Sequence, residues 1–136
     1  MKDEQGGTAG RILVADDDPA ILRLVKAIVE KEGFNVVTAR DGKEAYQLLK
    51  SGEKFGIGIF DVVMPYIQGT ELVKFMQSEK QLKDIPVIVM TAEQNPKLSS
   101  DSLTAGAVAF LPKPFTATQL KTMLQMFAQR IKKNQS

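Results

Sequence analysis

The sequence contains no cysteine and no histidine, and its apolar runs are short. Without cysteine the chain has no disulfide framework and no thiolate metal site. Without histidine it has no imidazole to serve as a metal ligand, a catalytic base or an internal phosphate carrier. No apolar run approaches the roughly 20 residues that span a bilayer, and the polar, glycine-rich residues 1–10 do not resemble a signal peptide. We therefore expect a cytoplasmic protein without a membrane partner.

Strong charge of either sign is also missing. The net charge of +2 is too small to indicate a nucleic-acid partner. The 136 residues, with 43% hydrophobic and 25% charged side chains, are typical of one soluble domain. We expect that domain to cover residues 11–133, after a disordered leader over residues 1–10 and before a short tail over residues 134–136.

Five short apolar segments alternate with amphipathic segments along the chain. Several of the five are continuously apolar, which is typical of parallel strands buried on both faces. The expected strands are Ile12–Ala15, Phe34–Ala39, Ile57–Phe60, Val87–Met90 and Val108–Leu111. Strands that alternate with helices predict right-handed βαβ units and an open, doubly wound parallel α/β sheet with helices on both faces.

Capping residues predict where two of the helices begin and end. Asp18 is a suitable N-cap for the first helix, with Pro19 at its first position and Gly33 at its end. The third helix is expected over residues 70–79. Gln68 is a poor N-cap, so we expect Thr70 to take that role.

The fourth expected helix, Pro96–Ala105, is unlike the others. Its only large apolar side chains are Leu98 and Leu103, and most of its remaining residues are small or polar. Its intrinsic helix propensity and its apolar stripe are both weak. We therefore expect it to be the least stable helix of the domain.

Polar residues follow four of the five expected strands. In an open parallel sheet, ligands bind beyond the carboxyl ends of the strands, so these residues are the candidates for a site. They are Asp16, Asp17 and Asp18 after the first strand, Asp61 after the third, Thr91 after the fourth and Lys113 after the fifth. The second strand offers nothing comparable.

Carboxylates gathered at one edge need a positive partner. Two unit charges about 5 Å apart repel by roughly 3 kcal/mol at an effective dielectric constant near 20. A proton, Lys113 or a cation must neutralise them, and oxygen ligands without histidine or thiolate suit the hard cation Mg²⁺. Because Asp18 caps the first helix, Asp16 and Asp17 remain as metal ligands. The alternative for these two aspartates is an ordinary solvated turn.

Four segments, in this order and at successive strand ends, resemble the receiver domains of two-component response regulators, of the CheY-like type. They read Ile-Leu-Val-Ala-Asp-Asp-Asp-Pro, then Ile-Phe-Asp-Val-Val-Met-Pro with Gly69, then Val-Met-Thr-Ala, then Leu-Pro-Lys-Pro-Phe. The resemblance runs from Arg11 to about Lys132. It implies a flavodoxin-like (βα)5 fold with strand order 2-1-3-4-5.

The resemblance also implies roles for single residues. Asp61 matches the phosphoacceptor, and the Mg²⁺ ligands match Asp16, Asp17, Asp61 and the backbone carbonyl of Val63. The residues that contact phosphoryl oxygens match Thr91 and Lys113, the switch residues match Thr91 and Phe110, and the bond before Pro114 is expected to be cis.

The implied activity is that of a phosphoacceptor signalling domain and not of an enzyme. The phosphoryl donor is expected to be the phosphohistidine of a sensor histidine kinase or of a histidine phosphotransfer protein. Phosphorylation is expected to change the surface formed by the fourth helix, the fifth strand and the fifth helix, where a downstream target protein binds.

Three other functions remain open from the sequence. A receiver-like module acting through protein contacts without phosphorylation is the first. The second is a Mg²⁺-dependent phosphatase of the haloacid dehalogenase type with Asp16 as its nucleophile, although Ala20 departs from that family's pattern. A flavodoxin-like nucleotide binder is the third, but three aspartates in its first loop would repel phosphate.

Overall fold

The computed structural model describes residues 10–92 and 96–135, with side chains described as far as residue 127. Its elements are β1 (Arg11–Ala15), α1 (Pro19–Lys31), β2 (Asn35–Ala39), α2 (Gly42–Lys50), β3 (Ile57–Asp61), α3 (Gly69–Gln77), β4 (Val87–Thr91), α4 (Pro96–Ala105), β5 (Ala109–Pro112) and α5 (Ala117–Gln135). The expected leader lies outside the described residues except for Gly10, and so does residue 136. The last helix continues to Gln135, past the expected end of the domain at residue 133.

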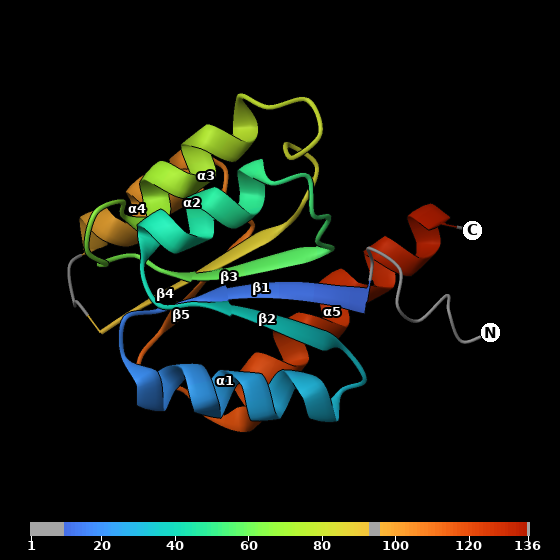
Figure 1. The fold of residues 1–136 in the computed structure, drawn as a ribbon. Helices are drawn as coiled ribbons and strands as arrows, with labels where there is room; N and C mark the ends of the chain where they lie inside the picture. The colour runs from blue at the N-terminus through green and yellow to red at the C-terminus, as the bar shows by residue number, and fades with distance from the viewer. Residues whose placement is uncertain (1–9, 93–95, 136) are drawn as a thin grey trace.

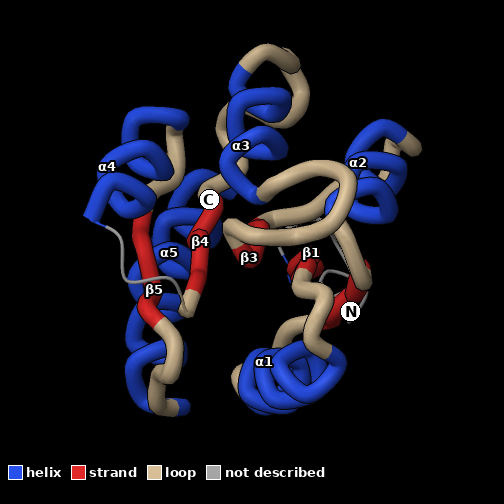
Figure 2. Tube along the Cα trace, turned by 90° about the vertical axis from the view of Figure 1, so that its left-hand side faces the viewer, coloured by secondary structure: helices blue, strands red, loops and turns tan. Residues whose placement is uncertain are grey.

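All five strands are parallel, in the order β2-β1-β3-β4-β5. Helices α1 and α5 cover one face of the sheet, and α2, α3 and α4 cover the other (Figures 1 and 2). The strand order and the two helical layers confirm the prediction. Among the described residues, no helix is both long enough and apolar enough to cross a membrane.

The core divides into two apolar layers because strand side chains alternate between the faces of a sheet. From β1, Leu13 points into the layer under α2, α3 and α4, whereas Ile12 and Val14 point into the layer under α1 and α5. Every residue of β3 and of β4 is buried. This explains why these central strands are apolar along their length, with polar residues only at their carboxyl ends.

Helix ends agree with the sequence at α1 but not at α3. The Asp18 carboxylate accepts a hydrogen bond from the backbone N–H of Ala20 at 2.9 Å, and Gly33 has a φ of 96° at the other end. In α3, however, the N-cap is Gln68 and not Thr70. The prediction was wrong because Glu71 supplies the cap contact, its carboxylate accepting from the Gln68 N–H at 2.8 Å.

Helix α4 has the predicted bounds and little packing. Of its ten residues, only Ser102 is buried, and the Ser102 hydroxyl donates to the carbonyl of Leu98 at 2.7 Å. Leu103 is 49% exposed. An element that buries so little apolar surface has little to hold it in one position.

Candidate functional site

The polar residues that follow the strands meet at the carboxyl edge of the sheet, the edge that faces the viewer in Figure 2. Asp16 follows β1 directly, Asp61 and Thr91 are the last residues of β3 and β4, and Lys113 follows β5. The strand register sets Asp61 beside Met90 and Thr91 beside Pro112. Parallel strands of similar length therefore bring residues from four separate turns to one place.

Lys113 joins the first and third strand ends. Its Nζ atom donates to Oδ2 of Asp16 at 2.7 Å and lies 3.2 Å from Oδ1 of Asp61. Asp16 is fully buried, and its other carboxylate oxygen accepts from the backbone N–H of Asp18 at 2.9 Å. Both oxygens of Asp16 thus have a donor, which offsets the cost of burying its charge.

Three carboxylates, those of Asp16, Asp17 and Asp61, each offer an oxygen within 4.8 Å of the other two. Unlike Asp16 and Asp61, Asp17 is exposed, and within the described part of the chain no hydrogen bond or ion pair holds its carboxylate. All three donors are hard oxygen atoms, and one of them faces solvent. This set fits Mg²⁺, which prefers carboxylate ligands and keeps several of its waters.

Burial and charge alter the acid–base properties of the site. Burial, together with the neighbouring charges of Asp16 and Asp17, raises the pKa of Asp61 to about 6, although the charge and hydrogen bonding of Lys113 act in the opposite direction. Burial alone would lower the pKa of Lys113, but its hydrogen bond to Asp16 and the charges of Asp61 and Asp16 raise it above the usual lysine value. Lys113 therefore stays a cation between two carboxylates.

The remaining predicted site residues surround this group. Thr91 is 2% exposed, and its carbonyl accepts from the backbone N–H of Lys113 at 2.9 Å. The bond between Lys113 and Pro114 is cis, the isomer that the resemblance implies. Val63 is 45% exposed in the loop after β3. Phe110 is partly buried and packs against the apolar layer under α2, α3 and α4.

Two backbone features near Asp61 were not predicted. Gly69 starts α3 directly against Asp61, because a Cβ atom at Gly69 would overlap the Asp61 carbonyl oxygen. Tyr66 has a φ of 72°, and a hydrogen bond from the Ile67 N–H to the Pro65 carbonyl at 2.9 Å closes this turn. The sequence places Gly69 in the receiver-like pattern but does not indicate its contact with Asp61. A tyrosine at positive φ has no sequence signal, because glycine or asparagine is usual there.

Comparison with known protein families identifies the family of the chain. Residues 12–125 match the model of the response regulator receiver domain. The chain belongs to the response regulator receiver domain family. The CheY-like resemblance is thereby confirmed, and the phosphatase and nucleotide-binder alternatives lose their support.

The relatives of this receiver domain include proteins of about its own length and proteins about twice as long. It is 35% identical over 122 residues to chemotaxis protein CheY-3 of Vibrio cholerae, covering 89% of this chain and 93% of the relative. It is 33% identical to response regulator MprA of Mycolicibacterium vanbaalenii, covering 88% of this chain but only 51% of that protein. The receiver domain thus spans about half the length of MprA.

Solved structures agree with the fold. The CheY-like receiver domain protein of Methanospirillum hungatei superposes with a TM-score of 0.83 at 31% identity, covering 91% of this chain and 97% of the other. Chemotaxis response regulator CheY4 of Vibrio cholerae gives a TM-score of 0.80 at 32% identity, covering 87% and 98%. The flavodoxin-like (βα)5 architecture is therefore that of CheY-like receiver domains.

Proposed function

We propose that this receiver domain accepts a phosphoryl group on Asp61 from a phosphohistidine of a sensor histidine kinase or a histidine phosphotransfer protein. The observation that carries the proposal is the charge arrangement around Asp61. Two further carboxylates lie within 4.8 Å, and the Lys113 ammonium lies 3.2 Å away. A plain protein-binding surface has no need of three crowded acids and a partly buried lysine. A site that handles phosphoryl groups needs both a nucleophile and cations.

Asp61 is the nucleophile in this proposal. One oxygen of its ionised carboxylate attacks phosphorus while the phosphorus–nitrogen bond of phosphohistidine breaks, and the electron pair of that bond stays with the imidazole, which takes up a proton. The product is an acyl phosphate on Asp61. With a pKa of about 6, Asp61 is largely ionised at neutral pH and ready for attack. Because these 136 residues contain no histidine, the donor is expected to lie outside them, as a phosphohistidine or as a small phosphate compound.

Asp16, Asp17, Asp61 and the backbone carbonyl of Val63 are the residues that would hold Mg²⁺. When bound, the ion supplies positive charge to phosphoryl oxygens and offsets the repulsion among the carboxylates. Asp16, held by Lys113 and the Asp18 N–H, gives the site a fixed side. Asp17, which faces solvent, gives it an open side where water and ion can enter.

Lys113 and Thr91 would hold the phosphoryl group after transfer. Lys113 already lies within ion-pairing distance of Asp61, so a phosphoryl group added there would come within reach of its ammonium. Thr91 ends the neighbouring strand, where its hydroxyl is suited to donate to a phosphoryl oxygen.

We further propose that phosphorylation changes the surface formed by α4, β5 and α5, through Thr91 and Phe110. Thr91 is followed by the loop that leads to α4, whose only buried residue is Ser102. Phe110 packs partly buried in β5. A weakly packed helix is shifted by a small change in local charge or hydrogen bonding. A downstream protein that binds this surface, and a location in the cytoplasm, belong to the same proposal.

The test uses acetyl phosphate, which can give up its phosphoryl group without a protein donor. Incubation with acetyl phosphate and Mg²⁺ should add the mass of one phosphoryl group to the intact chain, with acetate as the leaving group. Hydroxylamine should then remove the added phosphoryl group. Asp61→Asn should abolish the gain, and a chelator should prevent it. No gain in the wild-type chain would favour the alternative, a receiver-like interaction module acting without phosphorylation. A gain that persists in Asp61→Asn would place the phosphoryl group elsewhere.

A further inference from the structure

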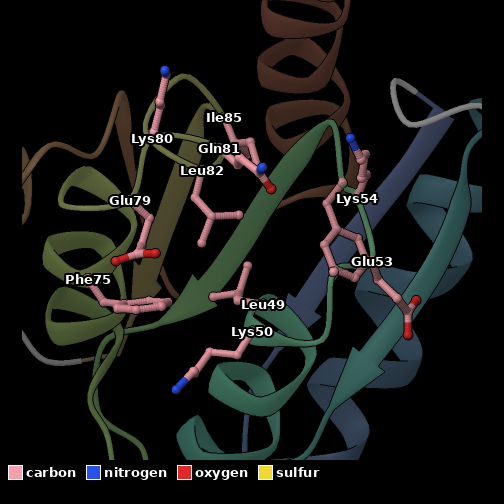
Figure 3. A pocket seen from close by; sticks show the side chains of 12 residues that line it. Leu49, Lys50, Glu53, Lys54, Phe75, Glu79, Lys80, Gln81, Leu82 and Ile85 are labelled. Atoms are coloured by element: carbon pink, nitrogen blue, oxygen red, sulfur yellow. The ribbon is translucent and has the colours of Figure 1, made fainter.

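A hollow of about 550 Å³ lies at the edge of the sheet opposite Asp61 (Figure 3). It is lined by the end of α2 with the loop leading to β3, and by the end of α3 with the loop leading to β4. These loops enter the amino ends of two five-residue strands. At about 3.3 Å per residue, the hollow is on the order of 16 Å from the phosphoacceptor. The two places are thus separate.

The inner wall of the hollow is apolar. Leu49, Phe55 and Leu82 line it, and all three are buried. Figure 3 shows Leu49 from α2 and Leu82 from the loop after α3 pointing toward one another across the opening. Phe75 and Ile85, both partly buried, extend the wall. The volume is within the range of small-ligand sites and larger than one aromatic side chain needs.

The rim of the hollow is mainly basic. Lys50, Lys54 and Lys80 line it and are exposed. Two acidic residues also line it, but Glu53 is held by Arg11, whose Nη2 lies 2.6 Å from its carboxylate. In Figure 3 the Glu53 carboxylate points away from the opening. The Lys50 ammonium lies over the Tyr46 ring, 5.3 Å from its centre, so Lys54 and Lys80 are the freer cations of the rim, and Glu79 is its one acidic residue without an ion-pair partner among the described residues.

We propose that this hollow binds an acidic peptide segment of a partner protein, with one large apolar side chain of the segment inserted between Leu49 and Leu82. An apolar wall with exposed lysines at its rim complements an apolar anchor flanked by carboxylates. The long lysine side chains can bring their ammonium groups to peptide carboxylates over a range of positions. The apolar wall holds the inserted side chain of the peptide in one place. This surface is independent of phosphoryl transfer, because none of its residues belongs to the group around Asp61.

The probe is a peptide, acetyl-Asp-Glu-Phe-Asp-Glu-amide, titrated into the ¹⁵N-labelled full chain and followed by NMR. The amide signals of Leu49, Lys54 and Leu82 should shift and saturate, with a dissociation constant of about 1 mM or tighter. Replacing the peptide's phenylalanine with alanine, or its acids with lysine, should abolish the saturable shift. No saturation, or equal binding by either control peptide, overturns the proposal.

Charge reversal tests the rim without touching the wall. Lys54→Glu combined with Lys80→Glu should weaken peptide binding about fivefold or more. Arg23→Glu, an exposed charge reversal on α1 behind the other face of the sheet, is the matched control and should leave binding unchanged. Asp61→Asn should also leave it unchanged, so that failure of this proposal is distinguishable from failure of the phosphoacceptor proposal. Loss of binding in Arg23→Glu, or retention in the double variant, contradicts the assignment.

Two other occupants of the hollow would give different results. If the same signals shift on dilution of the chain without peptide, a second copy of the chain occupies the hollow. If they shift on removal of residues 1–9, the chain's own leader occupies it. Either result overturns the proposal of an acidic partner segment.

Discussion

The Nζ atom of Lys113 lies 2.7 Å from Oδ2 of Asp16, across 97 residues of sequence and between two strands that are not neighbours in the sheet. Asp16 is fully buried, and Lys113 has only 13% of its side chain exposed. A contact between such groups is less screened by water than a surface ion pair. It ties the carboxyl ends of β1 and β5 together and holds a cation beside the carboxylates of Asp16 and Asp61.

Replacing the ammonium should therefore weaken the fold. We expect Lys113→Met to lower the free energy of unfolding of the metal-free protein by about 1 to 3 kcal/mol, because Asp16 is then buried without its cation. Saturating Mg²⁺ should restore part of the loss. Urea unfolding measures both effects. The control is Lys121→Met, whose exposed ammonium lies 3.9 Å from Glu32 and should change stability by less than about 1 kcal/mol. Equal losses would contradict the assignment.

The metal-free protein should lose stability as the pH rises through about 6. Asp61 holds its proton more tightly in the folded chain, with a pKa of about 6, than in the unfolded chain, where such a carboxyl titrates near about 3.9. The stabilisation from this difference is complete below about pH 4 and lost as pH rises past the folded pKa. The free energy of unfolding of Asp61→Asn should then exceed that of the wild type by up to about 3 kcal/mol near neutral pH. Urea unfolding in the presence of a chelator measures the difference. A difference between the two that does not vary with pH would contradict the raised pKa.

Asp17 should matter for the ion and little for the fold. We expect Asp17→Asn to weaken Mg²⁺ binding by about tenfold or more, since a charged ligand is lost, while metal-free stability stays nearly constant because Asp17 is exposed. Isothermal titration calorimetry gives the affinity. The adjacent substitution Asp18→Asn is the control, because asparagine caps a helix as well as aspartate does. Equal effects of the two variants would remove Asp17 from the set of ligands.

Gly69 should tolerate no side chain. Because a Cβ atom there would overlap the Asp61 carbonyl oxygen, Gly69→Ala should cost about 3 kcal/mol or more of unfolding free energy. Gly52→Ala is the comparison: Gly52 has a φ of 91° but open space around it, so only the backbone preference of about 1 kcal/mol is lost. Chemical denaturation of the two variants compares the cost of the steric overlap at Gly69 with the cost of the backbone preference at Gly52. A smaller loss at Gly69 than at Gly52 would mean that α3 moves away freely.

Much of the fold followed from the sequence because its local signals agree with the global arrangement. The apolar runs gave all five strands to within a residue or two, and Pro96–Ala105 is helical as predicted. The ends of parallel strands must share an edge, so the gathering of Asp16, Asp61 and Lys113 was also predictable.

The sequence did not predict which side chains pair with one another or which of the polar side chains are buried. Nothing in three consecutive aspartates tells which one is buried. The answer depends on Lys113, which reaches Asp16 and leaves Asp17 exposed. The N-cap of α3 was missed because it depends on the return contact from Glu71, which outweighs the poor capping preference of Gln68. Both are properties of neighbours in space, which one sequence does not specify.

The tight seat of Gly69 has a mechanical consequence. Because the first residue of α3 packs directly on the Asp61 backbone, we expect a displacement of the end of β3 to be passed on to this helix. If Asp61 is phosphorylated as proposed, we expect the resulting displacement to be taken up by the neighbouring element that packs least tightly. We expect that neighbour to be α4, in which only Ser102 is buried while Leu98 and Ala105 are partly buried against the core.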